Sequence, residues 1–144
     1  MTNQPTKREL NKEKRTAAIV EIAMQSFLDK GYAATSMSAI AETLGGSKAT
    51  LWSYFNSKEA LFTAVVDAMV RQFAQDIDEV LTSQTFSLPS VRRFCLRFID
   101  CMRRDRAARL FRLIIAEGER FPEIRDVFWI RGPVKMKEHV VGFY

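Results

Sequence analysis

Apolar side chains recur at spacings of three and four residues along most of the chain, and convincing strand-like alternation is absent. Because this is the period of an amphipathic helix, the pattern predicts an all-α fold. Glycine and proline supply most of the breaks between the expected helices. Helices are expected over residues 12–29, over a short stretch ending at residue 44, and over residues 47–55, 58–81, 91–103, 105–117, 122–129 and 133–141.

Residues 36–62 hold the most informative pattern, which is two short helices joined by a tight glycine turn and followed by a third helix. Ala41 is small enough to allow a close helix crossing, and Gly45, four residues later, tolerates the positive φ that the turn needs. Leu51 is placed to anchor the second helix, and Ile40 completes the apolar wedge. This combination indicates a helix-turn-helix, a motif that places its second helix in the DNA major groove.

The second helix of this motif is expected to expose side chains that suit contact with DNA. Lys48 could reach a guanine edge or a phosphate, and Thr50 could touch a thymine methyl group. Trp52 and Tyr54 offer an indole and a phenol donor for phosphate, although Trp52 could instead belong to the core. Lys58, at the start of the next helix, is a candidate phosphate clamp.

The net charge of +5 is densest at the N-terminus. Residues 1–15 carry five Lys or Arg side chains against two Glu, which gives +3 for this segment. We predict that residues 1–11 form a disordered basic arm that binds phosphate ahead of the helix-turn-helix. A solvated tail with no role in binding is the alternative that the sequence leaves open.

Residues 15–66 resemble the TetR family of bacterial transcriptional regulators, most densely in SKATLWSYFNSKEAL, residues 47–61. The resemblance implies three N-terminal helices that bind DNA. It also implies a C-terminal helical domain that binds a small molecule and dimerises, so that ligand binding releases the operator. By position in the family motif, the implied DNA-contact residues are Thr35, Ser36, Ser47, Lys48, Ala49, Thr50, Trp52, Ser53, Tyr54 and Lys58.

The chain departs from the family pattern in the motif and in length. Gly46 stands where an apolar residue is usual, so the turn loses a packing side chain. Ala49 replaces a common glycine, and Trp52 replaces a common tyrosine, which removes a hydroxyl group. The sequence ends at Tyr144, before the two long helices that form the dimer interface in the family. The chain is therefore expected either to be a truncated product or to dimerise in another way.

The C-terminal half is rich in aromatic and methionine side chains, which would line a ligand cavity in a member of this family. Each of them could instead be an ordinary core residue at helical spacing. His139, the only histidine, is expected at the surface or in packing rather than in contact with a ligand. The candidate lining residues are Phe73, Phe94, Phe98, Met102, Phe111, Phe128 and Trp129.

Composition and residue spacing exclude several classes of site. Cys95 and Cys101 are six residues apart, or about 600° around a helix, so they do not share a face and do not bridge easily. Without a Cys/His cluster, no metal site is expected. We find no nucleophile–base pair and no phosphate loop, so the protein is not expected to be an enzyme. Neither a signal peptide nor a membrane-spanning apolar run is present, and a cytoplasmic location is expected.

The expected organisation is a helix-turn-helix DNA-binding domain over residues 12–57 and a helical regulatory domain over residues 58–144 that is incomplete at its C-terminus. The expected function is that of a homodimeric repressor that binds a double-stranded DNA operator. A small-molecule effector of unknown identity would release it, and no cofactor is expected. The alternative is a helix-turn-helix interaction or structural protein without ligand control, because the usual dimerisation helices are absent.

Overall fold

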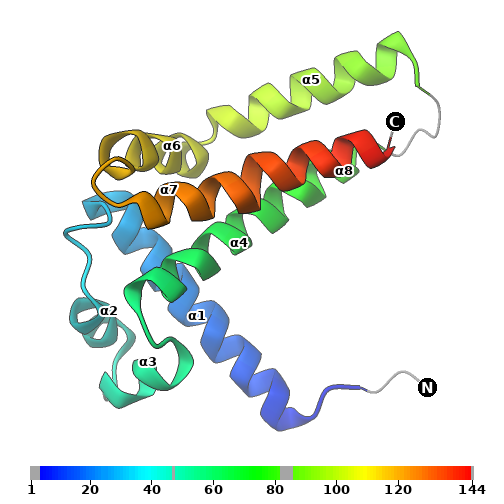
Figure 1. The fold of residues 1–144 in the computed structure, drawn as a ribbon. Coiled ribbons are helices and arrows are strands. Elements are labelled where there is room, and N and C mark those ends of the chain that lie inside the picture. Colours follow the sequence, from blue (N-terminus) through cyan, green and yellow to red (C-terminus); the bar gives the residue numbers. More distant parts are fainter. Residues whose placement is uncertain (1–3, 47, 82–85, 144) are drawn as a thin grey trace. The chain divides into compact units, whose positions relative to one another are not determined.

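A computed structural model describes residues 4–46, 48–81 and 86–143, and every regular element in these ranges is a helix (Figure 1). The contacts divide the chain into two compact units, residues 1–65 and 66–144. The division falls within the helix α4 (Lys58–Asp78). None of the described helices is long and apolar enough to cross a membrane.

The first unit contains α1 (Lys7–Lys30), α2 (Met37–Leu44), α3 (Lys48–Tyr54) and the start of α4. Helix α1 begins five residues earlier than the predicted start at residue 12, because Thr6 and Glu9 form a capping box. The Thr6 hydroxyl accepts the Glu9 amide at 3.3 Å, and the Glu9 carboxylate accepts the Thr6 amide at 2.6 Å. The prediction of disorder was therefore wrong for residues 7–11, which are helical and exposed.

An aromatic cluster occupies the core of the first unit. Phe27 of α1 stacks on Tyr32 with ring centroids 5.7 Å apart, and Phe62 of α4 meets both rings edge to face. These contacts bring the end of α1, the loop after it and the start of α4 together. Further side chains buried in this core are Ile19, Ala23, Met24, Met37, Ile40, Ala41, Leu51, Leu61 and Val65.

The second unit contains the rest of α4 together with α5 (Leu88–Arg103), α6 (Asp105–Glu117), α7 (Pro122–Trp129), η1 (Ile130–Val134) and α8 (Lys135–Phe143). Helix α5 begins three residues earlier than predicted because Ser87 caps it. The predicted break between residues 129 and 133 is absent, since α7, η1 and α8 follow one another without a gap (Figure 1). Pro133 lies inside η1, which is a π-helix.

Ion pairs connect α4 to α5, to the junction of α5 and α6, and to η1. The Asp76 side chain is mostly buried, and it accepts from the guanidinium of Arg104 and, at 3.5 Å, from that of Arg97. Asp67 pairs with Arg131 of η1 through two bonds of 2.7 and 2.8 Å. The sequence pattern does not predict these pairs, because the partners lie at least 21 positions apart along the chain.

The two cysteines occupy different environments in α5. Cys95 is exposed, whereas Cys101 is buried near the Asp76 carboxylate, and neither forms a disulfide. Burial raises the pKa of the Cys101 thiol, and the nearby Arg104 charge opposes this effect without cancelling it. The thiolate, which is the reactive form, is therefore disfavoured at Cys101.

Replacing Asp76 by asparagine should lower the free energy of unfolding by about 1–3 kcal/mol, because Arg97 and Arg104 lose a mostly buried counterion. Both arginines are partly exposed, so water recovers some of the loss. Urea unfolding followed by circular dichroism measures the change. Asp126→Asn is the matched control, since this exposed residue pairs with its neighbour Arg125 and should change stability by less than about 0.5 kcal/mol. Equal losses in the two variants would contradict a special role for Asp76.

Thiol labelling of the folded protein with an aromatic disulfide at neutral pH should modify Cys95 quickly and Cys101 only after unfolding. The expected reason is that Cys101 is shielded from the reagent and its thiolate is disfavoured. Absorbance of the released thiolate measures the rate for each class of thiol. In Cys95→Ser the fast phase should vanish, and a fast phase that persists there would show that Cys101 is accessible.

Candidate functional site

The turn between α2 and α3 has the backbone geometry that the sequence predicts. Gly45 has a φ of 76°, and its amide donates to the carbonyls of Ala41 and Glu42 at the end of α2. The wedge residues Ile40, Ala41 and Leu51 are all buried. The prediction that these residues form a helix–turn–helix core is confirmed.

Gly46, which departs from the family pattern, also has a positive φ, of 97°. A side chain at this position would be strained by the backbone conformation, whatever space surrounded it. The apolar residue that is usual in the family therefore does not suit this turn. The structure thus gives a backbone reason for glycine at both positions of the turn.

Helix α3 turns one side inward and exposes the other. Leu51 is completely buried, and at about 100° per residue the opposite side of the helix carries Ala49 and Ser53. Lys48 and Trp52 share one flank of that outer face, while Thr50 and Tyr54 share the other. The structure thus places six of the predicted DNA-contact residues around one helix, from Lys48 to Tyr54. Ser47, which was also predicted, lies outside the described residues.

The side chains on this face differ in their solvent exposure and in the hydrogen bonds that they already make. Trp52 is 48% exposed, so the alternative that it belongs to the core is wrong. Lys48, Ala49 and Ser53 are exposed as well. The Ser53 hydroxyl donates to the Thr50 carbonyl at 2.6 Å, which leaves its oxygen mainly as an acceptor.

Thr35 and Ser36, predicted as a pair of phosphate contacts, occupy opposite environments. Thr35 is only 2% exposed, and its hydroxyl donates to the Gly31 carbonyl at 2.8 Å and lies 3.1 Å from the Ser26 hydroxyl. Ser36 is exposed and caps α2 by accepting the Ala39 amide at 3.1 Å. The buried Thr35 side chain therefore ties the end of α1 to the following loop, and the predicted contact of Thr35 with phosphate stays a prediction.

Lys58, the predicted phosphate clamp, already makes two contacts within the first unit. Its ammonium group donates to the Tyr32 carbonyl at 2.9 Å and lies 4.3 Å from the centroid of the Tyr32 ring. These contacts join the start of α4 to the loop after α1. An ammonium group has three donors, so contact with phosphate stays a prediction alongside this structural role.

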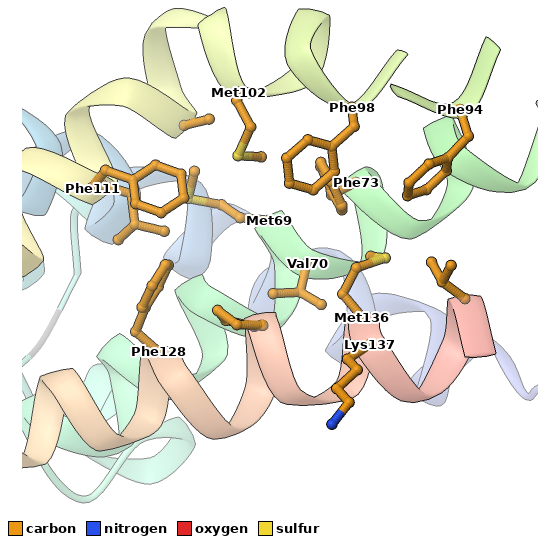
Figure 2. A pocket seen from close by; sticks show the side chains of 15 residues that line it. Met69, Val70, Phe73, Phe94, Phe98, Met102, Phe111, Phe128, Met136 and Lys137 are labelled. Atoms are coloured by element: carbon orange, nitrogen blue, oxygen red, sulfur yellow. The ribbon is translucent and has the colours of Figure 1, made fainter. Parts of the chain in front are cut away.

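The second unit contains a cavity of about 400 Å³, shown in Figure 2. Six of the seven predicted lining residues border it: Phe73, Phe94, Phe98, Met102, Phe111 and Phe128. Their role in ligand binding stays a prediction. Lining residues that were not predicted are Met69, Val70, Ala107, Leu110, Gly132, Pro133, Met136, Lys137 and Val140.

Trp129 does not line the cavity, and its prediction as a lining residue was wrong. Its side chain is 60% exposed. Adjacent residues of a helix point about 100° apart, so Phe128 faces the cavity while Trp129 faces solvent. On α8 the pair Met136 and Val140 recurs at a spacing of four, which is a signal that sequence periodicity could have supplied. His139 is exposed and lies 2.6 Å from the Asp78 carboxylate, in agreement with its expected place at the surface.

Comparison with known families identifies both units. Residues 19–65 match the model of the bacterial regulatory proteins of the tetR family, and residues 89–143 match the C-terminal domain of AefR-like transcriptional repressors. The two matches are separate and cover most of the chain. The first contains the helix-turn-helix, and the second contains α6, α7, η1, α8 and all of α5 except Leu88.

Two curated relatives are similar over half of the chain or more. The transcriptional activator FasR of Mycolicibacterium smegmatis is 30% identical over 96 residues, which is 67% of this chain and 44% of that protein. The transcriptional repressor ComR of Escherichia coli is 36% identical over 73 residues, or 51% of this chain and 35% of that protein. The aligned region of this chain therefore spans less than half the length of these relatives.

Solved structures extend the similarity to both units. A TetR-family regulator from Mesorhizobium loti is 31% identical with a TM-score of 0.71, and the match covers 83% of this chain and 61% of that one. The flavonoid-responsive regulator FrrA is also 31% identical with a TM-score of 0.71, over 84% of this chain and 61% of that one. Sequence motif, fold and relatives agree, and the chain belongs to the TetR family, whose members are transcriptional regulators and not enzymes.

Proposed function

We propose that this chain is a repressor that binds a double-stranded DNA operator through α3 and is released by a small apolar effector bound in the cavity of the second unit. The observation that carries the proposal is the outer face of α3. Leu51 anchors this short helix in the core, while Lys48, Trp52 and Ser53 are exposed on its other side. A helix held in this way suits the major groove.

In this proposal the contacts divide into base-reading and backbone-binding groups. Lys48 donates to a guanine edge or a phosphate, and the Thr50 methyl group meets a thymine methyl group. Trp52 and Tyr54 donate to phosphate, and Ser36 and Lys58 contact the backbone on either side of α3. Thr35 acts indirectly, because its buried hydroxyl holds the loop that precedes Ser36.

Two copies would bind as a homodimer in the cytoplasm, with heads about 34–36 Å apart to meet successive major grooves. The cavity supports control by an effector, and no cofactor is needed for binding or release. FrrA, a relative of similar fold, is described as flavonoid-responsive, which supports a small-molecule effector here as well. The alternative without ligand control is disfavoured, because a formed cavity of about 400 Å³ would then have no role.

Replacing Lys48 or Thr50 by alanine should weaken specific binding by about 1–3 kcal/mol for each base-reading interaction that is removed, with little change in stability. The operator is first selected from random DNA with the wild-type protein, and fluorescence anisotropy then measures each affinity at fixed salt. Both side chains lie on a helix whose buried anchor, Leu51, is retained.

Lys135→Ala is the control for Lys48→Ala, because it removes the same charge from an exposed position in the second unit. It should leave operator affinity within about twofold of the wild type. Unchanged affinity in both Lys48→Ala and Thr50→Ala, with the fold intact, would refute the assignment of α3 as the DNA-reading helix.

A further inference from the structure

The cavity of the second unit offers a ligand almost no polar partner. All of its lining residues except Lys137 have side chains without charge or strong hydrogen-bonding groups. In Figure 2 the Lys137 side chain points away from the phenylalanine and methionine side chains, with its nitrogen at the far end. A charged group of a ligand would therefore lose its water in the cavity without gaining a counterion.

Of the cations that neighbour lining residues along the chain, two are paired with carboxylates of α4. Arg131, next to the lining residue Gly132, is held by Asp67 through two short bonds. Arg97, next to the lining residue Phe98, is bound to Asp76. An acidic ligand would have to compete with these carboxylates for either of these two arginines.

The aromatic side chains of the wall form two separate groups. Phe98 lies edge to face with Phe73 at 5.6 Å between centroids, and Phe94 lies 6.0 Å from Phe98. Phe111 and Phe128 form the second group, edge to face at 5.3 Å. Figure 2 shows the two groups at opposite ends of the labelled side chains. Each group presents ring faces and edges against which a flat apolar ring could pack.

Between these two groups lie the flexible side chains of Met69 and Met102 (Figure 2). Thioether side chains adapt to irregular shapes and contact aromatic edges favourably. Methionine side chains here can pack against a short apolar link between two rings of a ligand, whereas they offer no fixed hydrogen-bonding partner to a polar group of the ligand. The volume of about 400 Å³ lies in the range of small-molecule sites.

We propose that the cavity selects an uncharged ligand with two aromatic ring systems joined by a short link, one ring in each phenylalanine group. This inference rests on the proposed function, in which the cavity is the effector site. It adds the chemical class of the effector. Acidic amphiphiles are disfavoured because Lys137 points away from the apolar wall, and single long alkyl chains are disfavoured because they do not match the two aromatic groups.

Two fluorescent probes with the same skeleton test the charge requirement on the wild-type protein without DNA. N-phenyl-1-naphthylamine is neutral, and 8-anilino-1-naphthalenesulfonate adds a sulfonate group. The neutral probe should bind at least about tenfold more tightly, because the sulfonate loses hydration without a partner. Equal or tighter binding of the sulfonate, especially if Lys137→Ala abolishes it, would overturn the proposal in favour of an acidic ligand.

Competition against the bound neutral probe tests the ring requirement. Diphenylmethane, which has two linked rings, should displace the probe at a concentration at least about fivefold lower than 1-decanol, an uncharged chain of comparable hydrophobicity. If the alcohol competes as well as the two-ring compound, the two phenylalanine groups do not select rings and that part of the proposal is wrong.

A matched pair of variants on α6 locates the bound probe. Ala107 lines the cavity, so Ala107→Phe should weaken binding of the neutral probe at least about tenfold by filling the space. Ala116 is exposed on the same helix, and Ala116→Phe should leave binding unchanged. Thermal melting checks that both variants fold. Equal affinity in a folded Ala107→Phe protein would place the probe elsewhere and overturn the proposal.

Methyl NMR of the wild-type protein locates the bound probe without a variant. The neutral probe should shift the methyl signals of Met69, Met102 and Met136, which line the cavity, and leave those of Met24 and Met37 in the first unit unshifted. Shifts confined to the latter two would overturn the assignment of the site.

Operator binding separates a failure of this inference from a failure of the proposed function. If the neutral probe binds in the cavity and DNA affinity is unchanged, the ligand class stands and release by an effector is wrong. If the sulfonate binds more tightly while Lys48→Ala still loses operator affinity, the DNA-binding function stands and the ligand class is wrong.

Discussion

Helix α4 has to bury side chains in both compact units, and most other features of the protein depend on this constraint. Phe62 completes the aromatic cluster of the first unit, and Ile77 lies in the core of the second. Because α4 contributes buried side chains to two cores, polar substitutions on its inner face should be poorly tolerated along most of its length. Its carboxylates at Asp67 and Asp76 then hold η1 and the junction of α5 and α6 through arginine side chains, so the second unit is organised around the same helix.

In the proposed function, stability and DNA recognition belong to different sides of α3. A helix of seven residues does not persist in water by its own propensity, so its existence depends on Leu51, on the turn at Gly45 and on packing against α2. The outer side chains contribute little to that packing. They are therefore free to vary with the sequence that is read, while the inner side keeps the helix in place. A change of specificity in such a helix has little effect on the fold.

Local pattern was enough to predict much of the motif and of the cavity wall, because caps, turns and helical faces depend on near neighbours. It placed the positive φ at Gly45 and the buried Leu51. It failed where the environment of a side chain depends on distant partners. Thr35 is next to an exposed cap yet is buried against Gly31, and Asp76 looks like a surface charge until Arg104, at the junction of α5 and α6, pairs with it. Charge alone did not indicate that residues 7–11 are helical.

The π-helical segment η1 sets the directions in which the side chains of α8 point around the helix axis. A π turn contains one residue more than an α turn, so it shifts the later side chains by about 100° relative to a regular helix. With this shift, Met136 and Val140 face the cavity. If the same residues formed a regular α turn instead, α8 would rotate by about 100° and Lys135 would take the direction of Met136, pointing an ammonium group toward an apolar site. The irregular turn around Pro133 thus acts as a register element that keeps the cavity free of charge.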